Sequence, residues 1–385
     1  MQYRNFGRLK WKVSALGFGA MRLPIINGDS SRINEDEAIY MIRYAIDNGV
    51  NYIDTAYPYH GGKGEVVVGK ALEDGYRERV KLATKMPTWL VNSQSDMDKY
   101  LEEQLLRLKT ERVDFYLLHG LNKERWKKMG ELNVFGWAEK AISNGKINYL
   151  GFSFHDDFDT FKDIVDGYDK WTFCQILYNY MDTEYQAGTR GLKYAASRGL
   201  AVVVMEPLAG GILAFPSSKE VQEIWDSSGV KRTPTEWGLQ WVWNHPEVSV
   251  VLSGMSTLEQ VKENIESACR SGVNILSEEE LETIKRVREK IRQYGYIGCG
   301  GCRYCMPCPQ GVGIPEIFAL YNEYNRVHGN ATRTAEVREQ YRRTIIPEKS
   351  ARRCANCGQC ENKCPQQLPI RKLLGKAAIV FESSR

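Results

Sequence analysis

The sequence predicts an α/β protein, a closed (β/α)8 TIM barrel followed by a small, mainly helical domain. From residue 13 to about residue 271, short apolar runs of β type alternate with amphipathic helical stretches, as in strand–helix units around a parallel sheet. We count eight units, the number that closes a barrel. The 385 residues also exceed the size at which one core stops growing, roughly 250 to 300 residues. We therefore expect a barrel over residues 1–275, a linker helix over 276–295 and a second domain over 296–385.

Each expected strand is short and apolar, and a helical stretch follows it. The strands are residues 15–19, 52–54, 81–84, 115–118, 149–153, 174–177, 201–205 and 249–252. The helices start near Glu35, Gly64, Ser95, Phe135, Phe158, Thr189, Pro234 and Leu258. Several helices end at a glycine just before the next strand, as at Gly49 and Gly145. An open doubly wound sheet is disfavoured, because the turn that starts at Gly17 does not complete a Gly-x-Gly-x-x-Gly pattern.

The composition is that of an ordinary globular chain. Hydrophobic residues make up 43% of the sequence, charged residues 26%, and the formal net charge is +4. This balance implies no strong field toward nucleic acid or a membrane surface. The first residues lack the apolar core of a signal peptide, and no run of about 18 apolar residues occurs. We therefore expect a cytoplasmic protein with no nucleic-acid or membrane partner.

Eight of the ten cysteines lie in two tight runs near the C-terminus. The first run is Cys299, Cys302, Cys305 and Cys308, followed by Pro309; the second is Cys354, Cys357, Cys360 and Cys364, followed by Pro365. Thiolates at this spacing can converge on one metal centre, and the second run has the spacing of bacterial ferredoxins. Two four-cysteine zinc sites would leave the third cysteine of each run and both Cys-Pro steps unexplained. The runs therefore predict two [4Fe–4S] clusters, whose free thiol ligands fit a reducing compartment.

In ferredoxins the cysteine before proline binds the other cluster, so the two runs are expected to exchange one ligand each. One cluster then takes Cys299, Cys302, Cys305 and Cys364, and the other takes Cys354, Cys357, Cys360 and Cys308. An internal duplication is indicated, because Ile314 and Ile370 follow the two Cys-Pro-Gln steps at the same offset. The segment between the runs is longer than a ferredoxin connection and is predicted to be helical near Pro315 and Ala335. We expect a helical ferredoxin-like iron–sulfur domain.

Polar residues end the second, third and fourth expected strands, at the end of a barrel where active sites lie. They are Asp54, Tyr59, Lys85 and His119. Reduction of a carbonyl by hydride needs a proton donor at the oxygen, and a phenol with a pKa near 10 needs help from its neighbours. Lys85 would favour the phenolate of Tyr59, and Asp54 would anchor Lys85. His119 would position the carbonyl oxygen.

These residues give the chain its resemblance to the aldo-keto reductase family. The matching phrases run from Asp54 to Tyr59, from Ala83 to Lys85 and from Tyr116 to His119, and the likeness covers roughly residues 1–275. The resemblance implies that Asp54, Tyr59, Lys85 and His119 form a catalytic tetrad that reduces a small carbonyl substrate, an aldehyde or a ketone. It also implies NADP(H) as cofactor, with NAD(H) left open, bound without a Rossmann domain. The two cysteine runs would place the chain in a subgroup with a C-terminal two-cluster domain.

The same resemblance implies a set of cofactor-binding residues at the ends of strands and in the following loops. The nicotinamide would lie near Ser153 and Gln175, and the phosphates near the loops after the seventh and eighth strands. Glycines there would let backbone amides approach the phosphates. The full set is Gly19, Ala20, Met21, Asp54, Ser153, Gln175, Met205, Pro207, Leu208, Gly210, Ser253, Gly254, Met255, Ser256, Gln260 and Asn264.

Three positions depart from the family pattern. The chain has Ser153-Phe154-His155 where the family often has Ser-Asn, and Met205 stands where an aromatic residue often stacks on the nicotinamide. The arginine that commonly holds a 2′-phosphate after the eighth strand is missing, and Lys262 or Arg270 would have to replace it.

The sequence leaves the role of the clusters open. They would exchange single electrons with a protein electron carrier, sense redox state or stabilise the fold. An alternative to the reductase is a redox-sensing adaptor that binds NADP(H) with little carbonyl turnover. A basic segment around Arg342, Arg343, Lys349, Arg352 and Arg353 is either a docking site for an acidic carrier or a solvated helix face. A helix that begins after Ser277 is expected to link the two parts.

Overall fold

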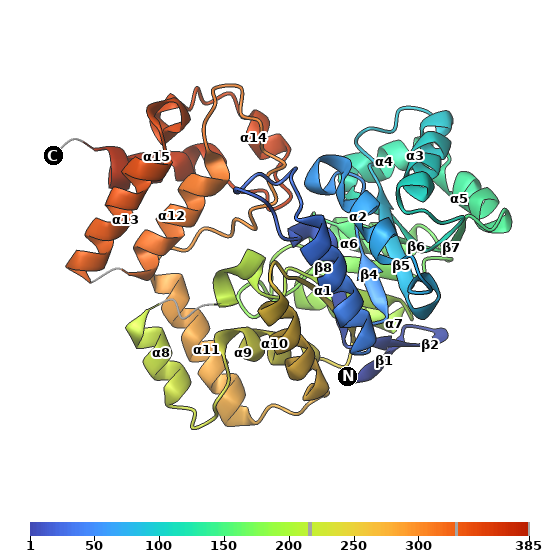
Figure 1. Ribbon diagram of the computed structural model, residues 1–385, viewed down its shortest axis with the longest axis horizontal. Coiled ribbons are helices and arrows are strands. Elements are labelled where there is room, and N and C mark those ends of the chain that lie inside the picture. The colour runs from blue at the N-terminus through green and yellow to red at the C-terminus, as the bar shows by residue number, and fades with distance from the viewer. Residues whose placement is uncertain (215–217, 328–329, 384–385) are drawn as a thin grey trace. The chain divides into compact units, whose positions relative to one another are not determined.

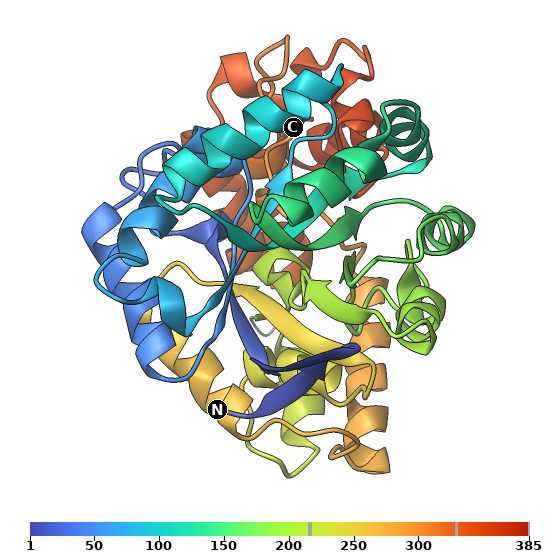
Figure 2. The same cartoon turned by 90° about the vertical axis from the view of Figure 1, so that its right-hand side faces the viewer.

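The computed structural model describes residues 1–214, 218–327 and 330–383 (Figures 1 and 2). The chain forms two compact units. The first combines Met1–Pro207 with Leu239–Leu276, and the second combines Leu208–Gly238 with Ser277–Arg385. The second unit thus includes a segment that we expected inside the barrel domain; the domain boundaries themselves stay a prediction. Among the described residues, no helix has the length and apolar character needed to span a membrane.

Eight parallel strands of the first unit close into a barrel, which confirms the expected fold (Figure 2). Their order around the barrel is β10-β3-β4-β5-β6-β7-β8-β9. The strands are β3 (Leu16–Gly19), β4 (Tyr52–Asp54), β5 (Lys81–Met86), β6 (Val113–Leu121), β7 (Ile147–Phe154), β8 (Phe173–Leu177), β9 (Ala201–Met205) and β10 (Val248–Gly254). Nearly every residue in them is buried, because helices cover the outside of a parallel sheet.

The helices start within about one residue of the expected positions. They are α1 (Glu35–Asp47), α2 (Gly64–Ala71), α3 (Gln94–Arg107), α5 (Val134–Ser143), α6 (Phe158–Asp166), α7 (Gly188–Ser197), α9 (Pro234–Trp243) and α10 (Leu258–Cys269). Two further helices, α4 (Lys123–Glu131) and α8 (Lys219–Asp226), lie in the long connections after β6 and β9. Our prediction of one helix per strand missed both, although Asn122 and Ser218 cap them with the side-chain oxygens that favour helix starts.

A hairpin that the sequence analysis missed closes the amino-terminal end of the barrel. It consists of β1 (Tyr3–Phe6) and β2 (Leu9–Ser14), which pair antiparallel. Phe6 is fully buried, and its ring lies 4.6 Å from that of Phe115 and 5.7 Å from that of Phe173. These rings belong to a core cluster built on the first residues of several strands. The hairpin therefore closes the end opposite to the one where the predicted catalytic residues lie.

The second unit has a core of its own. Helix α8 packs against α11 (Glu278–Gln293), and Ser277 caps α11 in a capping box with Glu280, as expected for the linker helix. The helices α12 (Ile314–Arg326) and α13 (Ala331–Thr344) confirm the expected helical insert, and α14 (Gln359–Asn362) and α15 (Ile370–Glu382) follow. Residues of α12 to α15 and of the segments before them form one cluster, which includes Val312, Phe318 and Leu374. Cysteines of both runs pack against this cluster.

Candidate functional site: a catalytic tetrad and two cysteine runs

The four predicted catalytic residues lie together at the carboxyl end of the barrel. Lys85 Nζ donates hydrogen bonds to Asp54 Oδ1 at 2.6 Å and to the carbonyl of Thr55 at 2.7 Å. The same ammonium lies 5.2 Å from the centroid of the Tyr59 ring. The rings of Tyr59 and His119 are 6.2 Å apart and nearly perpendicular. Tyr59 begins the short 3-10 helix Tyr59–Gly62, which follows β4. The chain between Asp54 and Tyr59 therefore turns so that the Tyr59 ring lies beside Lys85.

Burial dominates the electrostatics of this site. It lowers the pKa of Lys85 and raises the pKa of Asp54, while the ion pair between them opposes both shifts. Desolvation also lowers the pKa of His119 well below 6.5, and the charge of Lys85 adds to that shift. His119 is therefore a neutral imidazole at pH 7, which can donate a hydrogen bond to a carbonyl oxygen without bringing a second positive charge beside Lys85.

A buried carboxylate, Glu65, holds the part of β5 that carries Lys85, and the sequence did not predict this role. Glu65 is 0% exposed and accepts hydrogen bonds from Thr84 Oγ1 at 2.6 Å, Gln104 Nε2 at 2.7 Å and Arg107 Nη1 at 3.2 Å. Gln104 Nε2 also donates to the carbonyl of Lys85 at 3.0 Å. The network thereby fixes the backbone of β5 on both sides of the Lys85 side chain. The only signal in the sequence was an acidic residue inside the apolar helix α2, which is easily taken for a helix-start charge.

Removing the charge of Glu65 is expected to weaken this support. Glu65→Gln should lower the free energy of unfolding by about 1.5 to 3 kcal/mol, because hydrogen bonds to a charged group become neutral ones. The control is Glu73→Gln, which removes one partner of the exposed ion pair between Lys109 and Glu73 and should cost less than about 1 kcal/mol. Urea unfolding followed by circular dichroism measures both. Equal losses in the two variants would show that the buried network contributes nothing special.

Several predicted cofactor residues of the first unit contact one another or their neighbours. Ser153 Oγ accepts a hydrogen bond from the Gly120 amide at 2.7 Å, and Asn264 Nδ2 donates to Ser253 Oγ at 2.9 Å. Gln175 Nε2 lies 3.7 Å from the sulfur of Met205. The side-chain oxygens of Gln175 and Asn264 are buried and find no hydrogen-bond donor among the described residues. Two buried acceptors of this kind suit a ligand that carries amide or amino groups at both ends, as a nicotinamide dinucleotide does.

The loop after β10 joins the loop after β3. Ser256 Oγ donates to the carbonyl of Arg22, and the Ser256 amide donates to Gln260 Oε1, each at 2.8 Å. Thr257 caps α10, so its amino-terminal end faces this loop. The stem of Arg22 covers Gly254, where a Cβ would lie 3.1 Å from Arg22 Cγ. Gly19, Ala20 and Met21 precede Arg22, and Met255 completes the loop.

The two substitutes that we considered for the missing arginine differ in position. Arg270 caps the far end of α10, roughly 18 Å along the helix axis from Thr257, which is too far to reach a phosphate at the helix start. The ammonium of Lys262 lies 5.8 Å from the ring of Tyr44. Arg22, which the sequence analysis passed over, is the arginine that the structure brings to this loop.

His155, which belongs to the first departure from the family pattern, is a partly buried side chain. Its Nδ1 lies 3.2 Å from Gln186 Oε1, and burial lowers its pKa to about 4. Pro207 ends the main part of the first unit, whereas Leu208 and Gly210 fall in the second unit, so their place in a cofactor site stays a prediction. Gly210 has φ +70° and lies against Gly300, where a Cβ on Gly210 would be 2.6 Å from the Gly300 Cα.

The two cysteine runs share a pattern of positive φ angles. Residues with positive φ occur two positions after the first cysteine, one after the second and three after the fourth in both runs. These are Gly301, Arg303 and Gly311 in the first run and Asn356, Gly358 and Gln367 in the second. Arg, Asn and Gln adopt positive φ only at a cost, so a repeat at matching offsets indicates that both loops wrap the same kind of object. The structure thus extends the internal repeat from sequence to backbone.

The predicted exchange of ligands requires Cys364 of the second run to lie close to cysteines of the first run, and the two runs do approach each other there. Burial raises the pKa of the Cys305 thiol to about 12, and the neighbouring thiols of Cys299, Cys364 and Cys360 add to the shift. Cys364 of the second run therefore lies beside first-run cysteines. Among the described residues, no three His, Cys, Asp or Glu side chains are close enough to hold one metal ion. The thiolates of a cubane bind different iron atoms and stand farther apart, and iron would displace the protons of such thiols. The donor set fits iron–sulfur clusters, while the ligand assignment stays a prediction.

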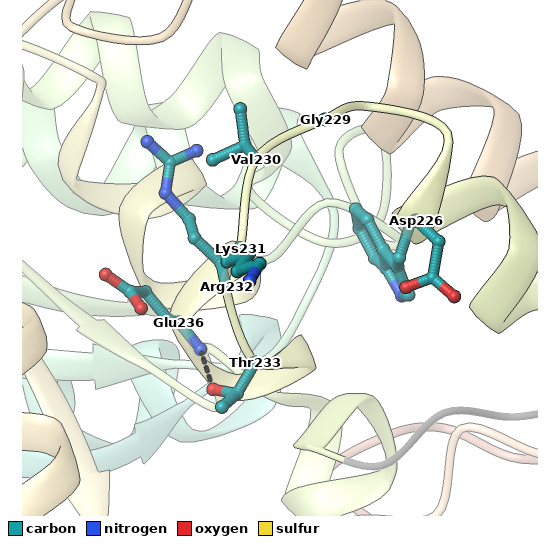
Figure 3. A pocket seen from close by; sticks show the side chains of 8 residues that line it. Asp226, Gly229, Val230, Lys231, Arg232, Thr233 and Glu236 are labelled. Atoms are coloured by element: carbon teal, nitrogen blue, oxygen red, sulfur yellow. Dashed lines mark hydrogen bonds between the residues drawn. The ribbon is translucent and has the colours of Figure 1, made fainter.

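The second unit has a hollow of about 580 Å3 (Figure 3). Its lining residues all lie before the two cysteine runs in the sequence. Trp225, Val230, Arg232 and Glu236 are among its lining residues. Arg232 forms an ion pair with Glu280 and lies 4.5 Å from the ring of Trp237. None of the predicted catalytic, cofactor or metal residues lines this hollow.

Comparison with known proteins agrees with this geometry. The model of the aldo/keto reductase family matches residues 15–289, and the model of the 4Fe-4S dicluster domain matches residues 298–369. L-galactose dehydrogenase of Arabidopsis thaliana is 27% identical over an alignment of 311 residues, and the match covers 76% of this chain and 96% of that protein.

Solved structures show the same fold. Aldo-keto reductase AKR11C1 from Bacillus halodurans, in its holo form, is 27% identical with a TM-score of 0.61, over 74% of this chain and 96% of that one. An aldo-keto reductase from Klebsiella pneumoniae in complex with NADPH is 27% identical with a TM-score of 0.59, over 75% and 96% of the two chains. The barrel, the tetrad-bearing strand ends and these matches together show that the chain belongs to the aldo/keto reductase family and carries a C-terminal 4Fe-4S dicluster domain.

Proposed function

We propose that this chain is an NADP(H)-dependent reductase of aldehydes or ketones whose two [4Fe–4S] clusters exchange single electrons with a protein partner. The observation that carries the proposal is the contact of Lys85 with Asp54 beside the ring of Tyr59, opposite a neutral His119. Support for the cofactor comes from the buried oxygens of Gln175 and Asn264 and from the NADPH complex of the Klebsiella pneumoniae relative.

The tetrad divides the work of carbonyl reduction. When bound, NADPH supplies the hydride that the carbonyl carbon receives. Tyr59 gives its phenolic proton to the carbonyl oxygen, so the product is an alcohol. Lys85 stabilises the phenolate left on Tyr59, Asp54 keeps Lys85 in place, and His119 donates a hydrogen bond that orients the carbonyl oxygen. Ser153, Gln175, Ser253 and Asn264 would hold the cofactor.

Turnover of a broad aldehyde and ketone panel with NADPH tests the reductase. The expected result is NADPH oxidation with stoichiometric formation of alcohol, measured by absorbance and chromatography. Tight NADPH binding with no turnover on the panel would overturn the proposal. It would favour the alternative, a redox-sensing adaptor that binds NADP(H).

Cluster content is tested by replacing the cysteine that is exchanged between the runs. Anaerobically purified protein should contain about eight iron and eight sulfide atoms per chain. Cys364→Ala should lower both counts by about half or more, because it removes a ligand that lies beside Cys305. Cys269→Ala, outside both runs and exposed, is the matched control and should retain full content. Zinc in place of iron, or equal loss in the two variants, would contradict the assignment.

A further inference from the structure

The segment that holds the second cysteine run is strongly basic. Residues 349–376 contain seven Lys or Arg and one acidic residue, a formal charge of +6, which exceeds the +4 of the whole chain. All seven basic side chains are exposed in the structure. We call them the basic face: Lys349, Arg352, Arg353, Lys363, Arg371, Lys372 and Lys376.

Part of the basic face lies beside the second run, since Arg353 and Lys363 directly precede Cys354 and Cys364 in the chain. Arg371 Nε donates to Glu361 Oε2 at 2.9 Å, and Arg371 Nη1 donates to the Asn356 carbonyl at 3.3 Å. The Arg371 guanidinium also lies against Gly358, which directly follows Cys357: a Cβ on Gly358 would be 3.7 Å from Arg371 Cζ. Cys357 is exposed. Helix α15, which carries Arg371, Lys372 and Lys376, also packs on the 3-10 helix Ala351–Arg353. This contact brings the two groups of basic residues together.

Most of this charge is not neutralised by acidic side chains that the structure describes. Among the described residues, no acidic side chain lies within 4 Å of the ammonium groups of Lys349, Lys363, Lys372 or Lys376. Arg371 is paired with Glu361 at 2.7 Å, and Arg352 reaches Glu382 only at 4.0 Å.

The neighbouring part of the basic segment behaves differently. Arg342 and Arg343 both contact Glu339, at 3.2 Å each, and form a solvated face of α13. The structure therefore divides the segment noted in the sequence into a neutralised part and an open part, and the open part leads directly into the second run.

We propose that the basic face docks an acidic one-electron carrier protein of the ferredoxin or flavodoxin class. The inference rests on the proposed electron-transfer role of the clusters. Complementary charge steers such short-lived encounters, whose interfaces are small. In each encounter one electron passes from the reduced carrier to the cluster predicted for Cys354, Cys357, Cys360 and Cys308. The carrier is oxidised by one electron, the cluster is reduced by one, and no bond or proton changes.

The test uses the anaerobically purified holoprotein and a purified acidic two-cluster bacterial ferredoxin as probe. Binding is measured by surface plasmon resonance, and electron transfer from the dithionite-reduced ferredoxin by stopped flow. The triple variant Lys349→Glu, Lys372→Glu and Lys376→Glu should weaken binding and slow transfer at least about tenfold at low salt, and the difference should shrink at high salt. The matched control makes the same charge change in the first unit, Lys10→Glu, Lys12→Glu and Lys140→Glu, and should stay within about twofold of the wild type.

Three results would overturn the inference: equal binding by the two triple variants, equally tight binding of the basic carrier cytochrome c, or tighter binding of duplex DNA than of ferredoxin. Iron and sulfide content and NADPH-dependent carbonyl reduction are measured on the same samples. If both are normal while ferredoxin fails to bind at the basic face, the docking inference fails and the proposed function stands. If the clusters or the reductase activity are absent in the wild type, the proposed function fails on its own measurements.

Discussion

Replacing Tyr59 with phenylalanine is expected to lower kcat/KM for carbonyl reduction by roughly 10²- to 10⁴-fold, the range for loss of a general acid. The variant keeps the ring that Lys85 and His119 face and removes only the proton donor. Cofactor affinity should change little, because the phenolic oxygen acts on the substrate. Steady-state kinetics with NADPH, together with a fluorescence titration of NADPH binding, separates the two effects.

The control for this experiment is another phenol two residues away. Tyr57 OH donates to Glu103 Oε2 at 2.8 Å, and the Arg107 guanidinium lies 4.2 Å from its ring. Tyr57 is thus committed to contacts with α3 and takes no part in the tetrad. Tyr57→Phe should keep activity within about threefold. If Tyr57→Phe were inactive and Tyr59→Phe active, the identity of the acid would be wrong.

The second large effect is expected from Lys85→Met, which should lower the free energy of unfolding by about 3 to 5 kcal/mol and abolish turnover. The Lys85 and Asp54 side chains are 1% and 3% exposed, so the substitution leaves a carboxylate buried without its cation. Urea unfolding of the wild type and the variant, followed by far-UV circular dichroism, measures the loss.

A double variant shows whether the cost comes from the orphaned charge. Asp54→Asn combined with Lys85→Met removes both charges, and it should be more stable than Lys85→Met alone although equally inactive. The exposed pair of Lys109 and Glu73 provides the comparison, since Lys109→Met should cost less than about 1 kcal/mol. A double variant no more stable than Lys85→Met would mean that packing, and not charge, explains the loss.

The sequence predicted the parts of the fold that depend on local pattern. Strands buried on both faces are continuous apolar runs, so all eight were found, and Asp54, Lys85 and His119 were found because each ends or follows such a run. The hairpin β1–β2 and the helices α4 and α8 were not predicted because they are insertions outside the eight repeated strand–helix units.

Contacts between residues far apart in the chain could not be predicted from the sequence. Glu65 acts through Thr84 and Gln104, which lie 19 and 39 positions away. The approach of Arg22 to Gly254 joins the first and last strands of the barrel. The matching positive φ angles of Arg303 and Gly358 depend on backbone geometry, which the cysteine spacing alone does not reveal.

The contact between Gly210 and Gly300 bears on the order in which the protein is made. Backbone meets backbone there, with no side chain between, so the turn at Gly210 reaches its final packing only when Gly300 is present. Gly300 directly follows Cys299, and a ribosome adds it 90 residues after Gly210. During synthesis the strands of the barrel are therefore complete before the loop that follows β9 can make its contact with Gly300, and that contact forms only with the first cysteine run.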